Sequence, residues 1–328
     1  MPARVSPLPK TILILSRVAV RWLAMLAVLA LGSTASADND VDTSQMLGTM
    51  AEASRQLDYQ GIFTYEYAGV LKSVRATHVV RDGVEYQRWS YLNGPSQEIL
   101  RHGQAGCPTG FDRAMRDLQP QPVIDYQQLA SYYEVHLRGE DRVADQDVWV
   151  IHLVPLDPFR YGYVFAIDKR SGLLLQSLLL DGGKRVLERF QYMDVSYGVD
   201  RELAEELIAA ATERGVTASC AATANGAAGV SGWQVSWLPP GFQLMGREMD
   251  GHGVETLLFS DGLSVFSIFF DPHQGGQLPE VQAQRGATVV QLVRIEARGR
   301  DHLVSVVGEI PLETAQRVAS RIEFAGRE

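Results

Sequence analysis

Cysteine is almost absent from this chain, which has two cysteines, Cys107 and Cys220, in 328 residues. Neither has a second cysteine three positions away, so the thiol pair of a redox motif and the paired ligands of a zinc site are both missing. In an oxidising compartment two lone cysteines can form a disulfide. The sequence does not set the distance between them, so a Cys107–Cys220 disulfide and two unpaired thiols remain alternatives.

Recognisable catalytic motifs are also missing. The chain has no HExxH, GxSxG, Walker loop or GxGxxG sequence, which are the patterns that place metal ligands, nucleophiles or phosphate-binding glycines. Its seven histidines are scattered, and no two lie four positions apart. We therefore expect no catalytic residues, no metal site and no cofactor, and we interpret the chain as a binding protein, not an enzyme.

Long hydrophobic runs are confined to the start of the chain. A secretory signal has a basic segment, a short apolar segment and a small-residue end, in that order. These features are present in Arg4, Lys10, Arg17 and Arg21, in Trp22–Leu31, and in Ala35-Ser36-Ala37. The apolar run is about half as long as the roughly 20 residues that span a bilayer. The sequence thus predicts a signal peptide over residues 1–37, cleaved after Ala37, and an exported protein.

Positive charge is in deficit: 30 Lys and Arg face 39 Asp and Glu, for a formal net charge of −9. The charged residues of the first 37 positions are all basic, so cleavage after Ala37 would leave a more acidic chain. An acidic protein repels phosphate instead of releasing its counterions. Nucleic acid is therefore not an expected partner.

The first part of the mature chain begins with apolar residues at helical spacing and continues with residues at strand spacing. Residues 42–45 resemble a helix-capping box, and Met46, Leu47 and Met50 then follow at helical spacing. From Tyr59 the period changes to two, with Phe63 and Tyr65 on one strand face. About eight strands with one long helix predict a strongly curved sheet wrapped around that helix, over residues 38–197.

Several predicted strands, such as residues 148–154 and 173–180, are apolar on both faces. Two-sided apolarity indicates either that both faces are covered or that one face lines an apolar cavity. The residues alone leave both alternatives open.

The remainder of the chain has a different composition. Residues 198–232 favour a short helix around Glu202–Leu207 and then become a small, polar, alanine-rich linker. Residues 233–328 contain short strands with Asp-Gly and Arg-Gly turns, and Pro311 suits the first turn of a final helix. The fold class expected from the whole chain is α+β and mainly antiparallel β, with a large N-terminal sheet and a small C-terminal sheet that carries a terminal helix.

Several phrases of the sequence carry a family resemblance. They include Arg160-Tyr161-Gly162-Tyr163, Leu178-Leu179-Leu180-Asp181, Leu187-Glu188-Arg189-Phe190, Trp237-Leu238-Pro239-Pro240-Gly241-Phe242, Ser260-Asp261-Gly262-Leu263 and Gly308-Glu309-Ile310-Pro311. In this order and spacing they resemble the RseB/MucB family of periplasmic regulators. The resemblance covers Tyr59 to Ile322 apart from the linker.

The resemblance implies a fold and a function. The first domain is expected to be similar to lipoprotein carriers, half-open β-barrels that hold acyl chains. The protein is expected to be a negative regulator of an envelope-stress response of the sigma-E/AlgU type. It would bind the periplasmic domain of a membrane anti-sigma factor, shield it from regulated proteolysis, and be released by a lipid or lipopolysaccharide-like ligand. The alternative is a periplasmic lipid or lipoprotein carrier acting through the first domain.

Candidate site residues follow from strand alternation and from this resemblance. An acyl chain or lipopolysaccharide-like ligand would contact aromatic residues of the first domain, namely Phe63, Tyr65, Trp89, Tyr163 and Phe165. The anti-sigma factor would contact Trp237 and Phe242 beside the double proline, although these two are also plausible core positions. A homodimer is left open.

Overall fold

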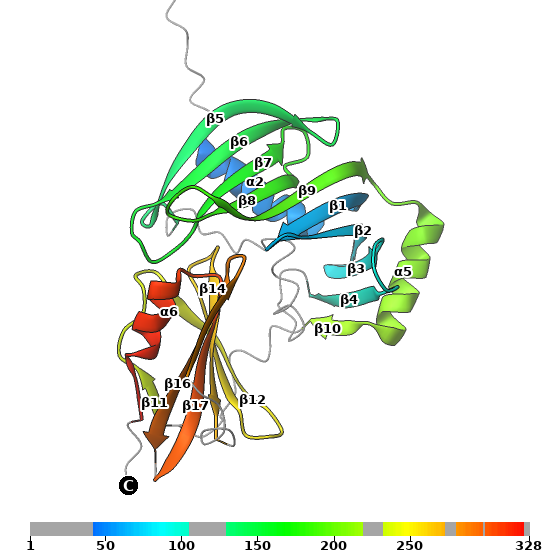
Figure 1. Ribbon diagram of the computed structural model, residues 1–328. Coiled ribbons are helices and arrows are strands. Elements are labelled where there is room, and N and C mark those ends of the chain that lie inside the picture. Colours follow the sequence, from blue (N-terminus) through cyan, green and yellow to red (C-terminus); the bar gives the residue numbers. More distant parts are fainter. Residues whose placement is uncertain (1–41, 105–128, 219–231, 273–279, 298, 325–328) are drawn as a thin grey trace, which may run out of the picture. The chain divides into compact units, whose positions relative to one another are not determined.

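The structure is a computed structural model that describes residues 42–104, 129–218, 232–272, 280–297 and 299–324 (Figure 1). Among these residues, none of the helices is both long and apolar enough to cross a membrane. The predicted signal peptide and its cleavage point, Cys107 and Cys220 lie outside the described residues.

The first part is a ten-stranded sheet. Its strands are β1 (Tyr59–Tyr67), β2 (Val70–Arg81), β3 (Val84–Tyr91), β4 (Glu98–Gln104), β5 (Tyr133–Val143), β6 (Gln146–Pro155), β7 (Gly162–Asp168), β8 (Leu174–Leu180), β9 (Val186–Tyr197) and β10 (Val216–Ala218). Their order is β10-β4-β3-β2-β1-β9-β8-β7-β6-β5. All neighbours are antiparallel except β10 and β4, which are parallel.

Helix α2 (Thr43–Gln56) lies against one face of this sheet. The Asp42 side chain caps it by accepting from the backbone N–H of Ser44, as the capping pattern predicted. Leu47 and Met50 are buried in one cluster with Ile151 and Phe165 of the sheet. Figure 1 shows the sheet curving around α2. The predicted curved sheet around one helix is therefore confirmed.

Helix α5 (Arg201–Arg214) covers the opposite face of the β3–β4 end. Its Ala204, Leu207 and Ala211 are buried together with Val79 and Leu100. The short helix predicted near Glu202 is part of α5. Because β10 follows and pairs with β4, the packed part of the first sheet continues to Ala218.

The second part is a six-stranded antiparallel sheet with the order β12-β13-β14-β17-β16-β15. Its elements are β12 (Gln243–Met249), β13 (Glu255–Ser260), β14 (Val265–Asp271), β15 (Val281–Arg285), β16 (Thr288–Ala297), β17 (Arg300–Gly308) and α6 (Leu312–Ala319). A separate pair joins β11 (Trp233–Val235) to β18 (Ile322–Phe324). Pro311 is the N-cap of α6, and the predicted small sheet with a terminal helix is confirmed.

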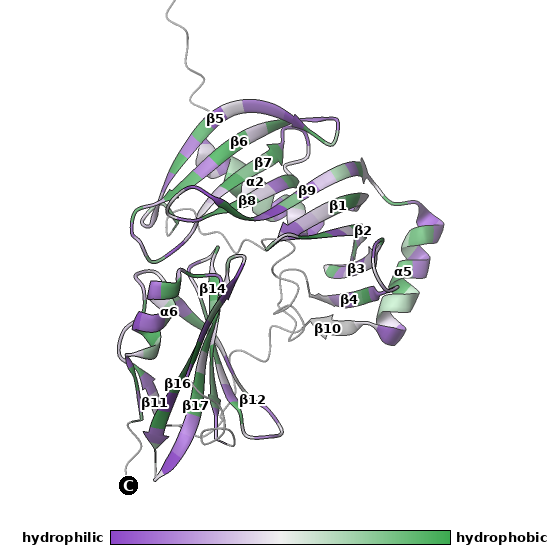
Figure 2. Ribbon diagram, in the orientation of Figure 1, coloured by the Kyte–Doolittle hydropathy of each residue, from purple (hydrophilic) through white to green (hydrophobic). Residues whose placement is uncertain are grey.

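The core of the second part lies between α6 and the sheet. Phe266, Ile268 and Val304 of the strands are buried with Ala315 and Val318 of the helix. Figure 2 shows hydrophobic residues concentrated along β14 and, in the first sheet, along β7. All residues of β7 are buried, in agreement with the two-sided apolar pattern of its neighbours.

Candidate functional site

Arg160 lies in the loop between β6 and β7, at the start of the Arg-Tyr-Gly-Tyr motif, and is 2% exposed. Asp157 shapes this loop by accepting from the backbone N–H of Phe159 at 2.9 Å, a turn that aspartate favours. The same carboxylate accepts from Arg160 Nε at 3.1 Å and from Nη2 at 2.9 Å. This two-pronged contact fixes the guanidinium plane.

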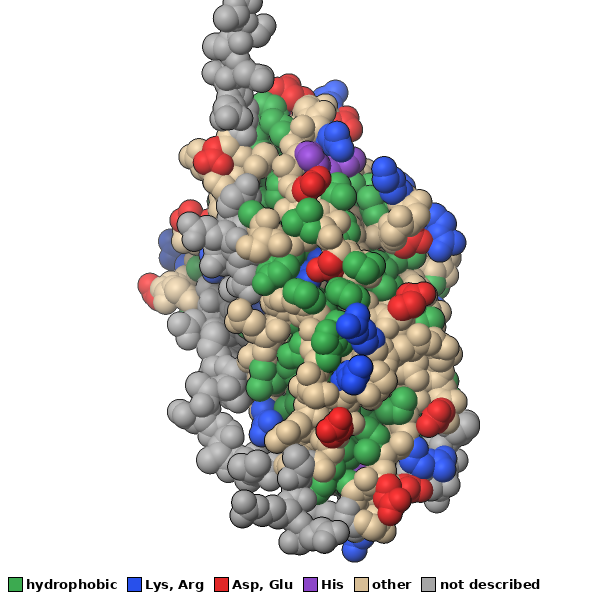
Figure 3. All heavy atoms as spheres, turned by 90° about the vertical axis from the view of Figure 1, so that its left-hand side faces the viewer, with side chains coloured by type: hydrophobic (Ala, Val, Ile, Leu, Met, Phe, Trp, Pro, Cys, Tyr) green, Lys and Arg blue, Asp and Glu red, His purple; other side chains and the backbone are tan. Residues whose placement is uncertain are grey.

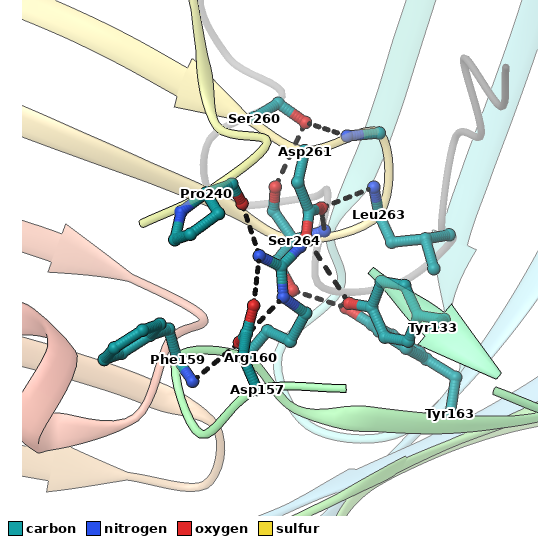
Figure 4. Close-up of polar contacts among 11 residues, drawn as sticks. Tyr133, Asp157, Phe159, Arg160, Tyr163, Pro240, Ser260, Asp261, Leu263 and Ser264 are labelled. Carbon is teal, nitrogen blue, oxygen red and sulfur yellow. Dashed lines mark hydrogen bonds and ion pairs between the residues drawn. The ribbon is translucent and has the colours of Figure 1, made fainter. Parts of the chain in front are cut away.

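The far side of the guanidinium contacts the second part of the chain. Arg160 Nη1 donates to Asp261 Oδ2 at 2.5 Å, and neither side chain has any exposed surface. Nη2 also donates to the carbonyl oxygen of Pro240. Asp261 lies in the turn between β13 and β14, where its Oδ1 accepts from the N–H groups of Leu263 and Ser264 at 3.0 and 2.8 Å. Figure 4 shows Arg160 between Asp157, Asp261 and Pro240.

Aromatic side chains enclose this ion pair. The guanidinium carbon lies 4.7 Å from the ring centre of Tyr132, 5.5 Å from that of Tyr133 and 5.4 Å from that of Phe242. Such rings favour a cation over their faces. Tyr163 Oη lies 3.1 Å from Ser264 Oγ, at the same turn (Figure 4). The Asp261 turn is therefore held by an ion pair and by phenols of the first sheet.

Burial dominates the titration of this cluster. It raises the pKa of Tyr133 and of Tyr163 well above the ordinary value of a phenol, so both remain protonated. Burial also raises the pKa of Asp261, although Arg160 and the two N–H groups oppose this. Burial opposes the charge of Arg160, but hydrogen bonding to Asp157 and the charge of Asp261 raise its pKa. The aspartate thus depends on these donors to stay ionised.

A second polar contact centres on Glu188 of β9, which is 6% exposed. Its Oε1 accepts from the backbone N–H of Ala287 at 2.9 Å, in the turn between β15 and β16. Its Oε2 accepts from the hydroxyl of Tyr65 on β1. Gln284 Nε2 of β15 lies 3.3 Å from the Tyr161 hydroxyl. Two hairpin turns of the second sheet therefore contact the first sheet.

The structure brings the predicted partner residues to the same region. Trp237 is half-buried, with its ring edge-on to Phe159 at 5.3 Å between centres and the Arg317 guanidinium 4.1 Å above it. Phe242 is 5% exposed and packs on Phe266 as well as on Arg160. Their role in partner binding stays a prediction.

The predicted acyl-contacting aromatics all lie on the face of the first sheet that α2 covers. Phe63, Tyr65 and Trp89 are buried in one cluster, and Tyr163 and Phe165 in another beside α2. Cross-strand register places Phe165, Ser177, Phe190 and Tyr65 in one row, so the two clusters are adjacent. Contact with an acyl chain also stays a prediction for these residues.

Sequence reasoning missed Arg160, Asp261 and Glu188 as structural centres. All three lie in phrases that carry the family resemblance, namely Arg160-Tyr161-Gly162-Tyr163, Leu187-Glu188-Arg189-Phe190 and Ser260-Asp261-Gly262-Leu263. That signal marked the positions without revealing that they meet. Within the described residues, no group of three or more His, Cys, Asp or Glu side chains is arranged to hold a metal ion.

A curved antiparallel sheet around a helix, joined through buried charges to a smaller helix-capped sheet, defines a two-part, mainly antiparallel β-protein. The MucB/RseB N-terminal domain model matches residues 42–212, and the MucB/RseB C-terminal domain model matches residues 227–323. The chain belongs to the MucB/RseB family, and the predicted resemblance is confirmed.

Named relatives match over nearly their full length. The sigma factor AlgU regulatory protein MucB of Pseudomonas aeruginosa is 36% identical over 92% of this chain and 98% of its own. The sigma-E factor regulatory protein RseB of Haemophilus influenzae is 27% identical over 94% and 100%. A crystal structure of MucB in complex with MucA(peri) is 35% identical, covers 87% of this chain and 100% of that chain, and has a TM-score of 0.69.

Proposed function

We propose that this protein is a periplasmic negative regulator of an envelope-stress sigma factor of the sigma-E/AlgU type. It binds the periplasmic domain of a membrane anti-sigma factor and shields that domain from regulated proteolysis. The observation that carries this proposal is the full-length similarity to MucB, a protein named as a sigma factor regulatory protein and solved in complex with MucA(peri).

The contacts between the two sheets support a regulatory binding role. Ion pairs and hydrogen bonds at two turns give those turns a defined position against the first sheet. A partner that binds one such arrangement better than another shifts the equilibrium between them by its differential affinity. Relatives that are named as regulatory proteins agree with binding, not catalysis, as the activity.

Release by a lipid or lipopolysaccharide-like ligand is the second element of the proposal. The aromatic residues Phe63, Tyr65 and Trp89, together with Tyr163 and Phe165, would contact the acyl chains. Tyr65 donates to Glu188, which also accepts from Ala287. A ligand that moves Tyr65 on this face of the sheet would therefore act, through Glu188, on a contact with the second part of the chain.

The test is calorimetric binding of the purified protein to the periplasmic segment of its cognate anti-sigma factor. Trp237→Ala is expected to weaken binding by about 2 kcal/mol or more, the usual cost of removing an aromatic anchor. Trp149→Ala is the matched control, since Lys169 Nζ lies 4.0 Å above that ring in a comparable cation–π contact. Circular dichroism and urea unfolding must show that both variants remain folded.

Two outcomes would contradict the proposal. The first is no measurable binding of the folded wild-type protein to the segment. The second is equal binding by the wild type and Trp237→Ala, which would remove Trp237 from the contact surface. Bound acyl chains in native mass spectrometry without partner binding would favour the carrier alternative.

A further inference from the structure

The face of the first sheet opposite α2, here called the outer face, carries a strip of aliphatic side chains. Register aligns Val154, Leu180 and Val186 near one end of the strands, and Val164 and Leu178 in the adjacent row. Val154 is 40% exposed and Val186 46%, and Leu156 beside them is 54% exposed. Some of the apolar side chains on the outer face of these strands are therefore exposed, and they lie in this strip.

Basic side chains border the aliphatic strip. His136 and His152 are direct cross-strand partners on β5 and β6, and Arg189 lies opposite Leu178 on β9. Arg138 lies at the bulge of β5 between Leu137 and Gly139, two residues after His136. Lys184 lies in the turn between β8 and β9, and the charges of both lower the pKa of His152. The outer face thus presents five groups that are cationic or become cationic on protonation.

Three of these five groups are permanent cations. Arg138, Lys184 and Arg189 form no ion pair within the part of the chain that the structure describes. Some exposed cations elsewhere pair with acids, namely Arg142 with Asp145, Arg185 with Asp181 and Arg201 with Glu205. Two exposed acids also lie on this face. Glu134 Oε2 lies 3.3 Å from His136 Nε2, and Glu66 on β1 is the cross-strand partner of Arg189. The three permanent cations outnumber these two acids, so the border of the apolar strip has a positive excess on a protein with a net charge of −9.

Figure 3 shows hydrophobic side chains next to histidine and basic ones on the upper part of the molecule, over β5 and β6. Apolar tips bordered by cations match the two zones of a phospholipid interface, the acyl boundary and the phosphates. Strands β6 to β9 are hydrogen-bonded on both edges, so this face offers no free backbone groups to a peptide strand. A bilayer needs no backbone hydrogen bonds from the protein. A docked polypeptide would have to pair its own backbone N–H and C=O groups without help from this sheet.

We propose that the outer face of the first sheet, with Val154, Leu156 and Val186 at its apolar strip and Arg138, Lys184 and Arg189 at its border, docks onto an anionic phospholipid bilayer. The surface shares no residue with the predicted partner contacts Trp237 and Phe242 or with the predicted acyl-contacting residues. It would hold the protein at the membrane surface independently of any protein partner.

The experiment is co-sedimentation of the purified protein with vesicles of phosphatidylglycerol and phosphatidylethanolamine, compared with vesicles of phosphatidylcholine. Binding is expected to the anionic vesicles and to fall between about 0.1 M and about 0.5 M salt, because screening shortens the reach of the charges. Arg138→Gln/Lys184→Gln/Arg189→Gln should reduce partitioning on the order of 100-fold, from the usual effect of three basic residues near an anionic surface.

The matched control is Arg142→Gln/Arg201→Gln/Arg300→Gln, which removes the same net charge from exposed positions outside the outer face. It should bind nearly as well as the wild type. A further variant, Val154→Ser/Leu156→Ser/Val186→Ser, should also bind less, because it keeps every charge and removes the apolar strip. Circular dichroism confirms that each variant is folded.

Several results would overturn the proposal. They are no binding of the wild type to anionic vesicles, equal binding to phosphatidylcholine, or an equal loss in the control variant. Binding of soluble poly-glutamate as tightly as vesicles would assign the surface to acidic polypeptides instead. The anti-sigma binding assay is performed without lipid, so failure of either proposal is visible separately.

Discussion

Arg160 joins three segments of the chain through one side chain. Its donors contact Asp157 in its own loop, the carbonyl of Pro240 and Asp261 in the second sheet. A planar guanidinium has enough donors in a fixed plane to do this, and a lysine ammonium does not. At the scale of the residue, this position has no equivalent substitute.

Replacing Arg160 by alanine leaves Asp261 buried without its cation. We expect Arg160→Ala to lower the free energy of unfolding by about 3–5 kcal/mol, the cost of breaking a buried pair from one side. Urea denaturation followed by fluorescence measures it. Arg142→Ala is the control, because its pair with Asp145 is exposed and should cost only about 0–1 kcal/mol. Equal losses in the two variants would contradict the prediction.

Gly241 follows the double proline and has a φ of +85°. A Cβ at this position would lie 2.3 Å from a ring carbon of Tyr132. Gly241→Ala should therefore destabilise the protein by about 1–3 kcal/mol, from backbone strain and crowding. Gly251→Ala, where an added Cβ meets no atom within 4 Å, is the comparison in the same thermal-unfolding assay. A Gly241→Ala variant as stable as Gly251→Ala would refute this account.

At the scale of the element, α2 is fixed to the sheet by a few apolar side chains. Leu47 is fully buried against the strands. We expect Leu47→Ala to cost about 2–5 kcal/mol, the range for large-to-small changes in a core. The exposed Glu52→Ala on the same helix should change stability by no more than about 0.5 kcal/mol. The free energies of unfolding of the two variants, measured in urea, separate the contribution of α2 packing from that of its helix propensity.

The β5–β6 hairpin contains a pH-sensitive group. Partial burial, with Arg138, His136 and Lys184 nearby, lowers the pKa of His152 below its ordinary value of 6.5. The unfolded chain therefore takes up this proton at a higher pH than the folded chain, so stability falls as pH drops through that range. Wild-type protein should lose more stability than His152→Gln between pH 7.5 and pH 5.5 in urea titrations. Parallel losses would show that His152 does not contribute.

Elements with a strong period could be predicted from the sequence, and polar or short ones could not. The helix capped by Asp42 and the strands containing Phe63 and Tyr65 follow directly from capping and alternation. Strand β15 is exposed at all five residues, so it has no buried face from which its position could be predicted. The ion pair of Arg160 with Asp261 was not predictable, because pairing across about a hundred residues depends on how two sheets pack and not on local pattern.

At the scale of the whole molecule, the two ligands of the proposed regulator are expected to be linked. A lipopolysaccharide-like ligand and the anti-sigma segment are expected to favour different arrangements of one protein. Lipopolysaccharide should then weaken binding of the segment by about 5- to 150-fold, the range of typical coupling free energies of 1–3 kcal/mol. Calorimetric titration of the segment with and without lipopolysaccharide measures this. An unchanged affinity would show that the two ligands bind without linkage.

Glu188 is the side chain through which we expect this coupling to act. One oxygen of its carboxylate accepts from Tyr65, which lies among the aromatics of the first sheet, and the other accepts from the backbone of Ala287 in the second. A molecule that displaces the Tyr65 phenol would take away one donor from the carboxylate and weaken the bonding that fixes its orientation. Coupling between the two sheets would then require the movement of only the Tyr65 ring. The strength of the coupling would depend on the free energy needed to move that ring out of its cluster.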